Sequence, residues 1–178
     1  ESKSFKYYLN SFNMKKFTSL DEATNLILKD LNSLLEIDCD CLMLSPQEWG
    51  SYDPTFSGVC LDTQAIYPST VKNGDLYLKQ LSNTIVSETY YSHHFRSLCP
   101  VTGQPDWASI EISYEGKEPD LRSIYNYIVS FRSHQGFHEQ CVEKIYSDIV
   151  SAYNPKECSV IAFFLRRGGI DICPVRSS

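Results

Sequence analysis

Apolar side chains recur at helical spacing along residues 4–35, and they predict two helices in tandem. Either Ser19 or Asp21 can cap the second helix, because both side chains accept hydrogen bonds from free backbone amides. Residues 38–44 alternate in polarity and are compatible with a strand. Residues 45–73 are rich in Pro, Gly, Ser, Thr and Asp, which is typical of a connector.

A strand and a second helix pair are predicted in the C-terminal half. Residues 107–114 alternate between apolar and polar side chains, which predicts a half-buried strand that ends in a turn over 116–119. Asp120 can cap the helix that follows, and Gly136 separates this helix from another over residues 137–152. The order of elements is therefore strand, then helix pair.

Residues 158–165 form a short apolar run that favours a strand, and two glycines separate it from the apolar positions of 170–175. The first part of the chain repeats this order in truncated form, as a helix pair followed by a strand. FKYYLNSFNMKKF and IYNYIVSFRSHQGF resemble each other, which supports an internal duplication. These elements together predict an α+β fold.

Length and charge narrow the class of protein. The 178 residues fit one ordinary domain or two small modules. A net charge of -6 gives no electrostatic reason to expect direct nucleic-acid binding. No apolar run reaches about 18 residues and the first residues are polar, so neither a membrane segment nor a secretion signal is expected.

The seven cysteines are an odd number and include no CxxC pair, so we expect reduced thiols in the cytoplasm and no zinc site. The chain begins without Met, within a helical pattern, so we also expect that sequence upstream of Glu1 is missing.

The segment SLCPVTGQPDW places Cys99 before a turn and Asp106 seven residues later, at the start of a predicted strand. The thiol and the carboxylate can therefore meet across the turn. A nucleophilic cysteine needs a group that takes or relays its proton, and Asp106 suits that role. The alternative is that Cys99 is a small buried apolar residue.

The segment SFRSHQGFHEQC places His138 and Glu139 just after a glycine. Together they offer a donor and an acceptor to a heterocyclic ligand, or a general acid and base. The alternative is an ordinary helix start, where Glu is favoured by the helix dipole. His134 is expected at the surface and lacks partners for a metal site, while His93 and His94 are expected on the loop that leads to Cys99.

In LRRGGIDICPVR, Arg166 and Arg167 precede two glycines. Guanidinium groups beside accessible backbone amides suit a phosphate group. The alternative is a glycine bulge with solvated arginines. No GxGxxG motif follows a strand, so a Rossmann site is not expected.

ESKSFKYYLNSF, SLCPVTGQPDW, SFRSHQGFHEQC and RRGGIDICPVR together resemble the NADPH-dependent 7-cyano-7-deazaguanine reductases, the nitrile reductases of queuosine biosynthesis, a tRNA-modification route. The resemblance covers nearly the whole chain. It implies the tunnelling fold, in which helix pairs pack on one face of an antiparallel sheet. The order of the motifs resembles the two-module branch of that family. We therefore expect a truncated first module with its connector in residues 1–75, and a catalytic second module in residues 76–178.

The resemblance also implies the chemistry. Cys99 attacks the nitrile carbon to give a covalent thioimide, Asp106 transfers protons, and hydride from NADPH reduces the intermediate in two rounds. A nitrile is a poor electrophile, so the covalent step makes a C=N group that accepts hydride more readily.

Matching positions of the family contact the deazapurine substrate or the cofactor. The residues implied for the substrate are Glu1, Ser2, His138 and Glu139, and those implied for NADPH are Ser2, Lys3, Arg167 and Gly168. Lys3 and Arg167 have a separate physical rationale, since the extra phosphate of NADPH requires cationic partners. We expect a homo-oligomer, with a homodimer favoured, and no metal cofactor.

Two other cysteines bear on this site. Cys60 lies two positions before Asp62 and is a rival nucleophile, but the family pattern gives it no role, so we expect it to be structural. Cys141 follows Glu139 closely, and we expect it near Cys99, where oxidation would join the two thiols in a reversible disulfide.

Three alternatives remain open. A relative with the same fold can transfer an amidino group by supplying ammonia to the thioimide, although the cationic Lys3 and Arg167 argue against it. A pterin cyclohydrolase would need a zinc set of Cys and His that the sequence does not display. A non-catalytic scaffold could keep the fold without the activity.

Overall fold

The computed structural model describes residues 2–44, 48, 54–64 and 78–178. The chain divides into two compact units, Glu1–Pro54 and Thr55–Ser178. The predicted boundary between residues 75 and 76 lies outside the described residues. Each unit is described below by itself.

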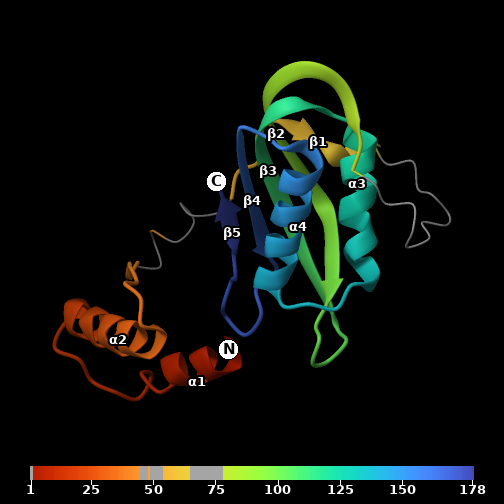
Figure 1. The fold of residues 1–178 in the computed structure, drawn as a ribbon. Helices are drawn as coiled ribbons and strands as arrows, with labels where there is room; N and C mark the ends of the chain where they lie inside the picture. The colour runs from red at the N-terminus through yellow and green to blue at the C-terminus, as the bar shows by residue number, and fades with distance from the viewer. Residues whose placement is uncertain (1, 45–47, 49–53, 65–77) are drawn as a thin grey trace. The chain divides into compact units, whose positions relative to one another are not determined.

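The first unit is a helix pair, as its apolar periodicity predicted (Figure 1). Helix α1 covers Ser2–Asn10 and helix α2 covers Leu20–Leu35. Ser19 is the N-cap of α2, and its hydroxyl accepts a backbone N–H of the first turn at 3.2 Å. The Tyr8 hydroxyl donates to the Asp30 carboxylate at 2.8 Å, which joins the two helices.

The strand predicted at residues 38–44 is wrong, because these residues are irregular. The Cys39 amide donates to the Asn32 side chain at 2.9 Å instead of to a ladder. A strand needs a neighbouring strand for its backbone groups, and within the described part of the chain none pairs with this segment. Alternating polarity alone was therefore insufficient to predict a strand here.

The second unit is built on a five-stranded sheet with strand order β1-β2-β3-β4-β5 (Figure 1). The strands are β1 (Val59–Cys60), β2 (Gln80–Leu98), β3 (Pro105–Pro119), β4 (Glu157–Phe164) and β5 (Val175–Ser177). Strands β2 to β5 pair antiparallel, as predicted, but the two-residue strand β1 pairs parallel to β2. A one-turn 3-10 helix, η2 (Leu61–Gln64), follows β1.

Sequence patterning did not predict β2, the longest strand, and the loop expected at His93 and His94 is wrong because both residues lie in β2. Its pairing register with β3 shifts between Ser92 and Phe95, which marks a β-bulge. Both Ser92 and Phe95 are buried, so burial changes phase across the bulge. Such a shift hides the period of two that identifies a strand.

Strand β3 shows the predicted alternation, and its even-numbered positions from Asp106 to Gly116 are buried. The predicted turn at 116–119 is wrong, because β3 stays paired with β2 through Lys117 and, after a register shift, at Pro119. Gly116 allows this continuation, since a Cβ there would lie only 2.6 Å from the Tyr114 hydroxyl. The Tyr114 hydroxyl donates to the Lys117 carbonyl at 2.7 Å.

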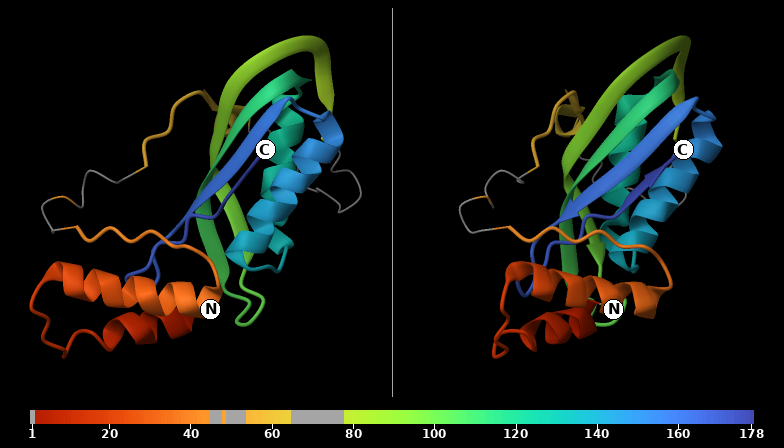
Figure 2. Two further views of the ribbon diagram at one scale, coloured as in Figure 1. Left: turned by 60° about the vertical axis from the view of Figure 1, so that its left-hand side comes forward. Right: turned by 90° about the vertical axis from the view of Figure 1, so that its left-hand side faces the viewer.

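Helices α3 (Leu121–Ser130) and α4 (His138–Tyr153) cover the same face of the sheet (Figure 2). Asp120 caps α3 as predicted, and its carboxylate accepts the Arg122 amide at 3.0 Å. A short 3-10 helix, η3 (Phe131–Ser133), connects them. The core between helices and sheet combines aliphatic side chains with buried aromatic rings. It includes Ile110, Ile112, Ile124, Ile128, Ile145, Ile149 and Val160, together with Phe95, Tyr125 and Phe131.

Three segments meet at one end of this sheet: the turn after β2, the first turn of α4, and the end of β4 (Figure 1). The backbone ties them together, since the Leu98 amide donates to the His134 carbonyl at 2.9 Å and the Gly136 amide donates to the Leu98 carbonyl at 3.1 Å. The start of α4 is therefore held against the end of β2. The candidate site lies at this end.

Candidate active site

The turn that carries Cys99 connects β2 to β3. Leu98 and Pro105 form the last strand pair, and beyond it the Cys99 amide donates to the Gln104 carbonyl at 2.9 Å. The Gly103 amide donates back to the Cys99 carbonyl at 2.8 Å. Gly103 has φ +67, a left-handed conformation that suits glycine. This closed turn presents a half-buried Cys99 thiol beyond the strand end.

The turn also prepares the thiol chemically. Hydrogen bonds from the Thr102 hydroxyl and from the Thr102 and Val101 amides lower the pKa of the Cys99 thiol. Partial burial and the charge of Asp106 act in the opposite direction and raise this pKa, but the hydrogen bonds prevail. Cys99 therefore reaches its thiolate form, the nucleophilic form, at a lower pH than an ordinary cysteine.

Asp106 lies at the second position of β3, where it pairs across the sheet with Ser97. Its side chain is only 5% exposed. Carboxylate oxygen Oδ1 lies 2.8 Å from Nη2 of Arg167 and 3.5 Å from Nε2 of His138. A buried carboxylate requires such partners, because an isolated charge is costly to remove from water.

Arg167 reaches Asp106 from the turn after β4. Nη2 of Arg167 also donates to the Pro105 carbonyl, beside Asp106. Arg167 and Ile170 exchange backbone hydrogen bonds of 3.0 and 3.3 Å, which close the turn. Arg166 braces it through contacts of 2.6 to 3.1 Å with both carboxylate oxygens of Asp171.

The same turn suits an anionic ligand. Gly168 and Gly169 have φ of +59 and +80, and no heavy atom lies within 4 Å of the place that a Cβ on Gly169 would occupy. The Arg167 side chain is 41% exposed, so its guanidinium also faces solvent. An accessible glycine backbone beside an arginine suits an anionic phosphate group.

His138 starts α4 and packs inward. Its ring stacks on Phe164 at the end of β4, with centroids 3.8 Å apart and planes 16° apart. Stacking holds the imidazole beside Asp106, where Nε2 makes the 3.5 Å contact. Glu139 occupies the next position and is exposed. The structure thus brings His138 together with Asp106 and Arg167, and leaves Glu139 facing solvent.

Cys141 lies one turn further along α4 and is fully buried. Burial is the largest effect on this thiol and raises its pKa, and the charges of Asp106 and Glu139 raise it further, whereas the Ser97 hydroxyl lowers it. Cys141 is therefore a poor nucleophile compared with Cys99. Both thiols are free in this structure, and a disulfide between them under oxidation stays a prediction.

The remaining predicted site residues belong to the first unit. Glu1 lies outside the described residues, and Ser2 and Lys3 begin α1, with side chains that are outside the description as well. Their roles therefore stay predictions.

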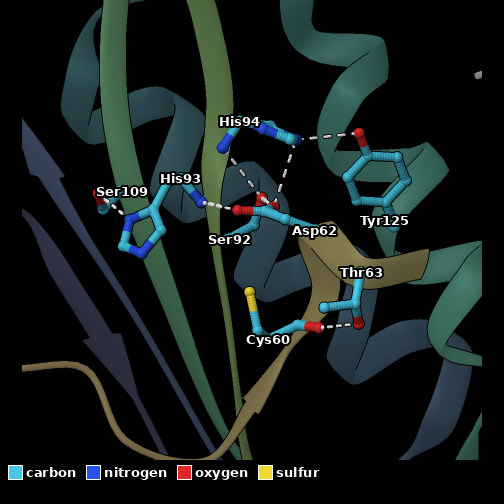
Figure 3. A network of polar contacts seen from close by, with 8 residues as sticks. All are labelled: Cys60, Asp62, Thr63, Ser92, His93, His94, Ser109 and Tyr125. Atoms are coloured by element: carbon cyan, nitrogen blue, oxygen red, sulfur yellow. Dashed lines mark hydrogen bonds and ion pairs between the residues drawn. The ribbon is translucent and has the colours of Figure 1, made fainter. Parts of the chain in front are cut away.

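A second cluster surrounds Asp62 in η2, farther back along β2 (Figure 3). The carboxylate of Asp62 accepts the Ser92 hydroxyl at 2.5 Å and the His93 amide at 2.9 Å, and lies 3.4 Å from Nδ1 of His94. His94 Nδ1 is also 3.1 Å from the Tyr125 hydroxyl. These groups occupy the bulge of β2, where backbone amides lack ladder partners, so Asp62 serves to satisfy the bulge.

Cys60, the rival nucleophile, lies beside this cluster (Figure 3). Its thiol interacts with the Tyr91 hydroxyl, and its carbonyl accepts the Thr63 hydroxyl at 2.9 Å. The carboxylate of Asp62 is engaged by the bulge.

A groove of about 340 Å³ opens along the middle of the β2–β3 pair and the start of β4. Hydroxyls and carboxylates line it, including Ser87, Thr89, Ser113, Glu115 and Glu157. Neither Cys99 nor Asp106 lines it, so it is separate from the candidate site. Within the described ranges, no three His, Cys, Asp or Glu side chains are grouped for a metal ion, and no helix has the length and apolar character to cross a bilayer.

Sequence reasoning missed two features of the site. No local signal marks Thr102, although its hydroxyl is the largest influence on the Cys99 pKa. The Asp106–Arg167 ion pair has no local signal, because its members come from two different strand ends. Only the pairing of β3 with β4 brings them together.

The fold and the site define an α+β protein that presents a cysteine of lowered pKa beside a buried, ion-paired aspartate. The family model described as a QueF-like protein matches residues 105–178. The model described as the N-terminal part of the nitrile reductase, 7-cyano-7-deazaguanine reductase, matches residues 1–42.

Similar proteins carry one name, NADPH-dependent 7-cyano-7-deazaguanine reductase. Those of Hahella chejuensis, Saccharophagus degradans and Buchnera aphidicola are 40%, 44% and 43% identical to this chain, and each alignment covers 100% of it. The chain belongs to the 7-cyano-7-deazaguanine reductase family. It spans 66%, 66% and 69% of the length of these relatives.

One solved structure that resembles the fold is an archaeosine synthase QueF-Like in the apo form. The TM-score is 0.46 at 18% identity, and the match covers 55% of this chain and 95% of that one.

Proposed function

We propose that this protein reduces the nitrile of 7-cyano-7-deazaguanine to an aminomethyl group with NADPH. Its relatives are named NADPH-dependent 7-cyano-7-deazaguanine reductases, which supports the proposal. The observation that carries the proposal is the pairing of a low-pKa thiol, Cys99, with the buried carboxylate of Asp106 at one sheet end. This arrangement is what covalent attack on a weak electrophile requires.

In the first step, the Cys99 sulfur bonds to the nitrile carbon. The thiol proton passes to Asp106 and from there to the nitrile nitrogen, so C≡N becomes the C=N–H of a thioimide. No atom leaves and no electrons are transferred, so the protein gains the full mass of the nitrile. Asp106 begins and ends this step in the same protonation state.

When bound, NADPH would supply hydride to this carbon in two rounds, and the S–C bond to Cys99 would break between them to return the thiol. Arg167 and the glycine turn beside it are the described residues that would hold an anionic part of the cofactor. Lys3 and Ser2 from α1, and Gly168, complete the proposed cofactor contacts. His138, Glu139, Glu1 and Ser2 are proposed to bind the deazapurine, with His138 held in place by Phe164.

The proposal includes the finer architecture. Residues 76–178, the larger part of the second unit, are proposed to form a tunnelling-fold module with two helices on one face of its sheet. Residues 1–75 are proposed to hold the rest of a first module and a connector. A homodimer is the proposed assembly.

Intact-mass spectrometry after mixing with 7-cyano-7-deazaguanine, without NADPH, tests the first step. We expect an increase by the mass of the whole nitrile, located on Cys99 by peptide mapping. Adding NADPH should then release the amine and consume the cofactor, measured by its absorbance. No adduct and no cofactor oxidation would overturn the proposal, whereas an adduct that reacts with ammonia but not with NADPH would favour the amidino-transferring alternative.

A further inference from the structure

Arg167 contacts the proton-transfer residue itself. Nη2 of Arg167 is 2.8 Å from Oδ1 of Asp106 and donates to the Pro105 carbonyl next to it. The Asp106 side chain is 5% exposed, whereas that of Arg167 is 41% exposed. One edge of the guanidinium therefore reaches a buried carboxylate while the rest of the side chain faces solvent.

The turn of Arg167 is built to hold this position. Backbone hydrogen bonds between Arg167 and Ile170 close it, and the contacts of Arg166 with Asp171 brace it from outside. The Pro105 contact fixes the guanidinium against the first residue of β3. A guanidinium that Pro105 fixes on a closed turn loses little further freedom when it pairs with a carboxylate.

Several titratable groups surround this ion pair. The turn after β2 contributes Cys99, whose thiol interacts with the Asp106 charge. Helix α4 contributes the nearby His138, the buried Cys141 and the exposed Glu139. Arg167 differs from all of them, because a guanidinium stays charged at every working pH.

We propose that Arg167 is a positioning residue for Asp106 in the thioimide-forming step, which needs no cofactor, in addition to its proposed contact with NADPH. The inference rests on the proposed function for its chemistry. Arg167 holds the Asp106 carboxylate charged and oriented toward Cys99, ready to take the thiol proton and pass it to the nitrile nitrogen. The step forms one S–C bond and one N–H bond and requires neither an oxidant nor a reductant.

The electrostatic consequence has a definite sign. The charge of Asp106 raises the pKa of Cys99, and a cation on Asp106 offsets part of that charge. Replacing Arg167 by a neutral residue leaves the carboxylate charge uncompensated. The Cys99 thiolate should then form at higher pH, and this effect should depend on Asp106.

The test measures the alkylation rate of Cys99 by iodoacetamide against pH, without substrate or cofactor, with peptide mapping to separate Cys99 from the other thiols. Arg167→Gln should move the midpoint of the profile to higher pH, and Arg167→Lys should restore part of the shift. The matched control is Arg176→Gln, which removes an arginine that pairs with Glu143 instead, and it should keep the native midpoint.

The shift should largely disappear when Arg167→Gln is made in an Asp106→Asn background. An equal shift in both backgrounds would mean that Arg167 acts on Cys99 directly, and it overturns the proposal, as does a native midpoint in Arg167→Gln. If Arg167→Gln does not fold, the alkylation profile of Asp171→Asn tests the proposal in its place. This change loosens the turn from outside, so the midpoint should rise in the same direction, and a native midpoint then overturns the proposal.

A second readout uses the substrate. Cofactor-free adduct formation should slow on the order of 10- to 100-fold in Arg167→Gln, the loss typical of a misplaced catalytic group. An unchanged rate overturns the proposal. The absence of any adduct in the native protein would instead refute the proposed function, while the alkylation profiles would still report on the pairing of Arg167 with Asp106.

Discussion

Asp62 and Asp106 are two aspartates of the second unit with similar immediate surroundings. Each has a histidine nitrogen nearby, at 3.4 Å for Asp62 with His94 and 3.5 Å for Asp106 with His138. Each also lies near a cysteine in the sequence. The other groups that contact each carboxylate differ. These groups show which aspartate has a structural role and which can take part in chemistry.

Asp62 accepts the Ser92 hydroxyl and the His93 backbone amide, which lies at the bulge of β2. Asp106 faces an arginine and acts electrostatically on a thiol of lowered pKa. An aspartate beside a histidine is therefore not evidence of a catalytic pair by itself. A carboxylate committed to backbone donors is a structural group, whereas one facing a nucleophile and a cation can carry protons.

The largest contrast should come from the two cysteines. Cys99→Ala removes the proposed nucleophile, so both the covalent adduct and the turnover should be lost completely. Cys60→Ala should retain the adduct and the turnover, because the Cys60 thiol lies beside Tyr91 in the structural cluster. Intact mass after mixing with the nitrile gives the answer, and an adduct that survives in Cys99→Ala would remove this cysteine from the mechanism.

The second largest contrast should be in the rate of adduct formation between variants of the two aspartates. Asp106→Asn cannot relay a proton, and adduct formation should slow on the order of 100-fold or more. Asp62→Asn, the isosteric control, should leave this rate close to native. Rapid mixing and quenching, followed by mass spectrometry, measures the rate of adduct formation in both variants. A near-native rate in Asp106→Asn, or equal losses in the two variants, contradicts the distinction.

The structural role of Asp62 should appear in the stability of the protein. In Asp62→Asn an amide donor replaces one oxygen that accepts a donor of the bulge. A buried donor left without an acceptor costs about 1–3 kcal/mol, so the free energy of unfolding should fall by that amount. Urea unfolding followed by circular dichroism measures it. Native stability in Asp62→Asn would show that water replaces the lost acceptor.

The smallest effect concerns the turn of Cys99. The Thr102 hydroxyl lowers the pKa of this thiol, so Thr102→Val should raise the pKa and move the alkylation midpoint to higher pH. At a fixed pH below the native midpoint, less thiolate is present and alkylation should be slower. Thr102→Ser, which retains the hydroxyl, should keep an alkylation profile closer to native. A midpoint that falls in Thr102→Val contradicts the assigned direction.

Local sequence signals determined much of this protein. The cap at Asp120, the alternation in β3 and the apolar spacing of α4 each depend on neighbouring residues, so they were predictable and are confirmed. The motif residues resembled one family, and the comparisons show that family. Cys99 and Asp106 could be paired in advance because only a short turn separates them.

Tertiary structure decided the rest. The bulge in β2 breaks the period that would have predicted the strand, and the His93 amide at the bulge donates to Asp62, which lies on a different element. The ion pair of Arg167 with Asp106 exists because β4 pairs with β3 and ends beside its start. A carboxylate's role depends on which distant groups the fold brings to it, and no sequence spacing records that.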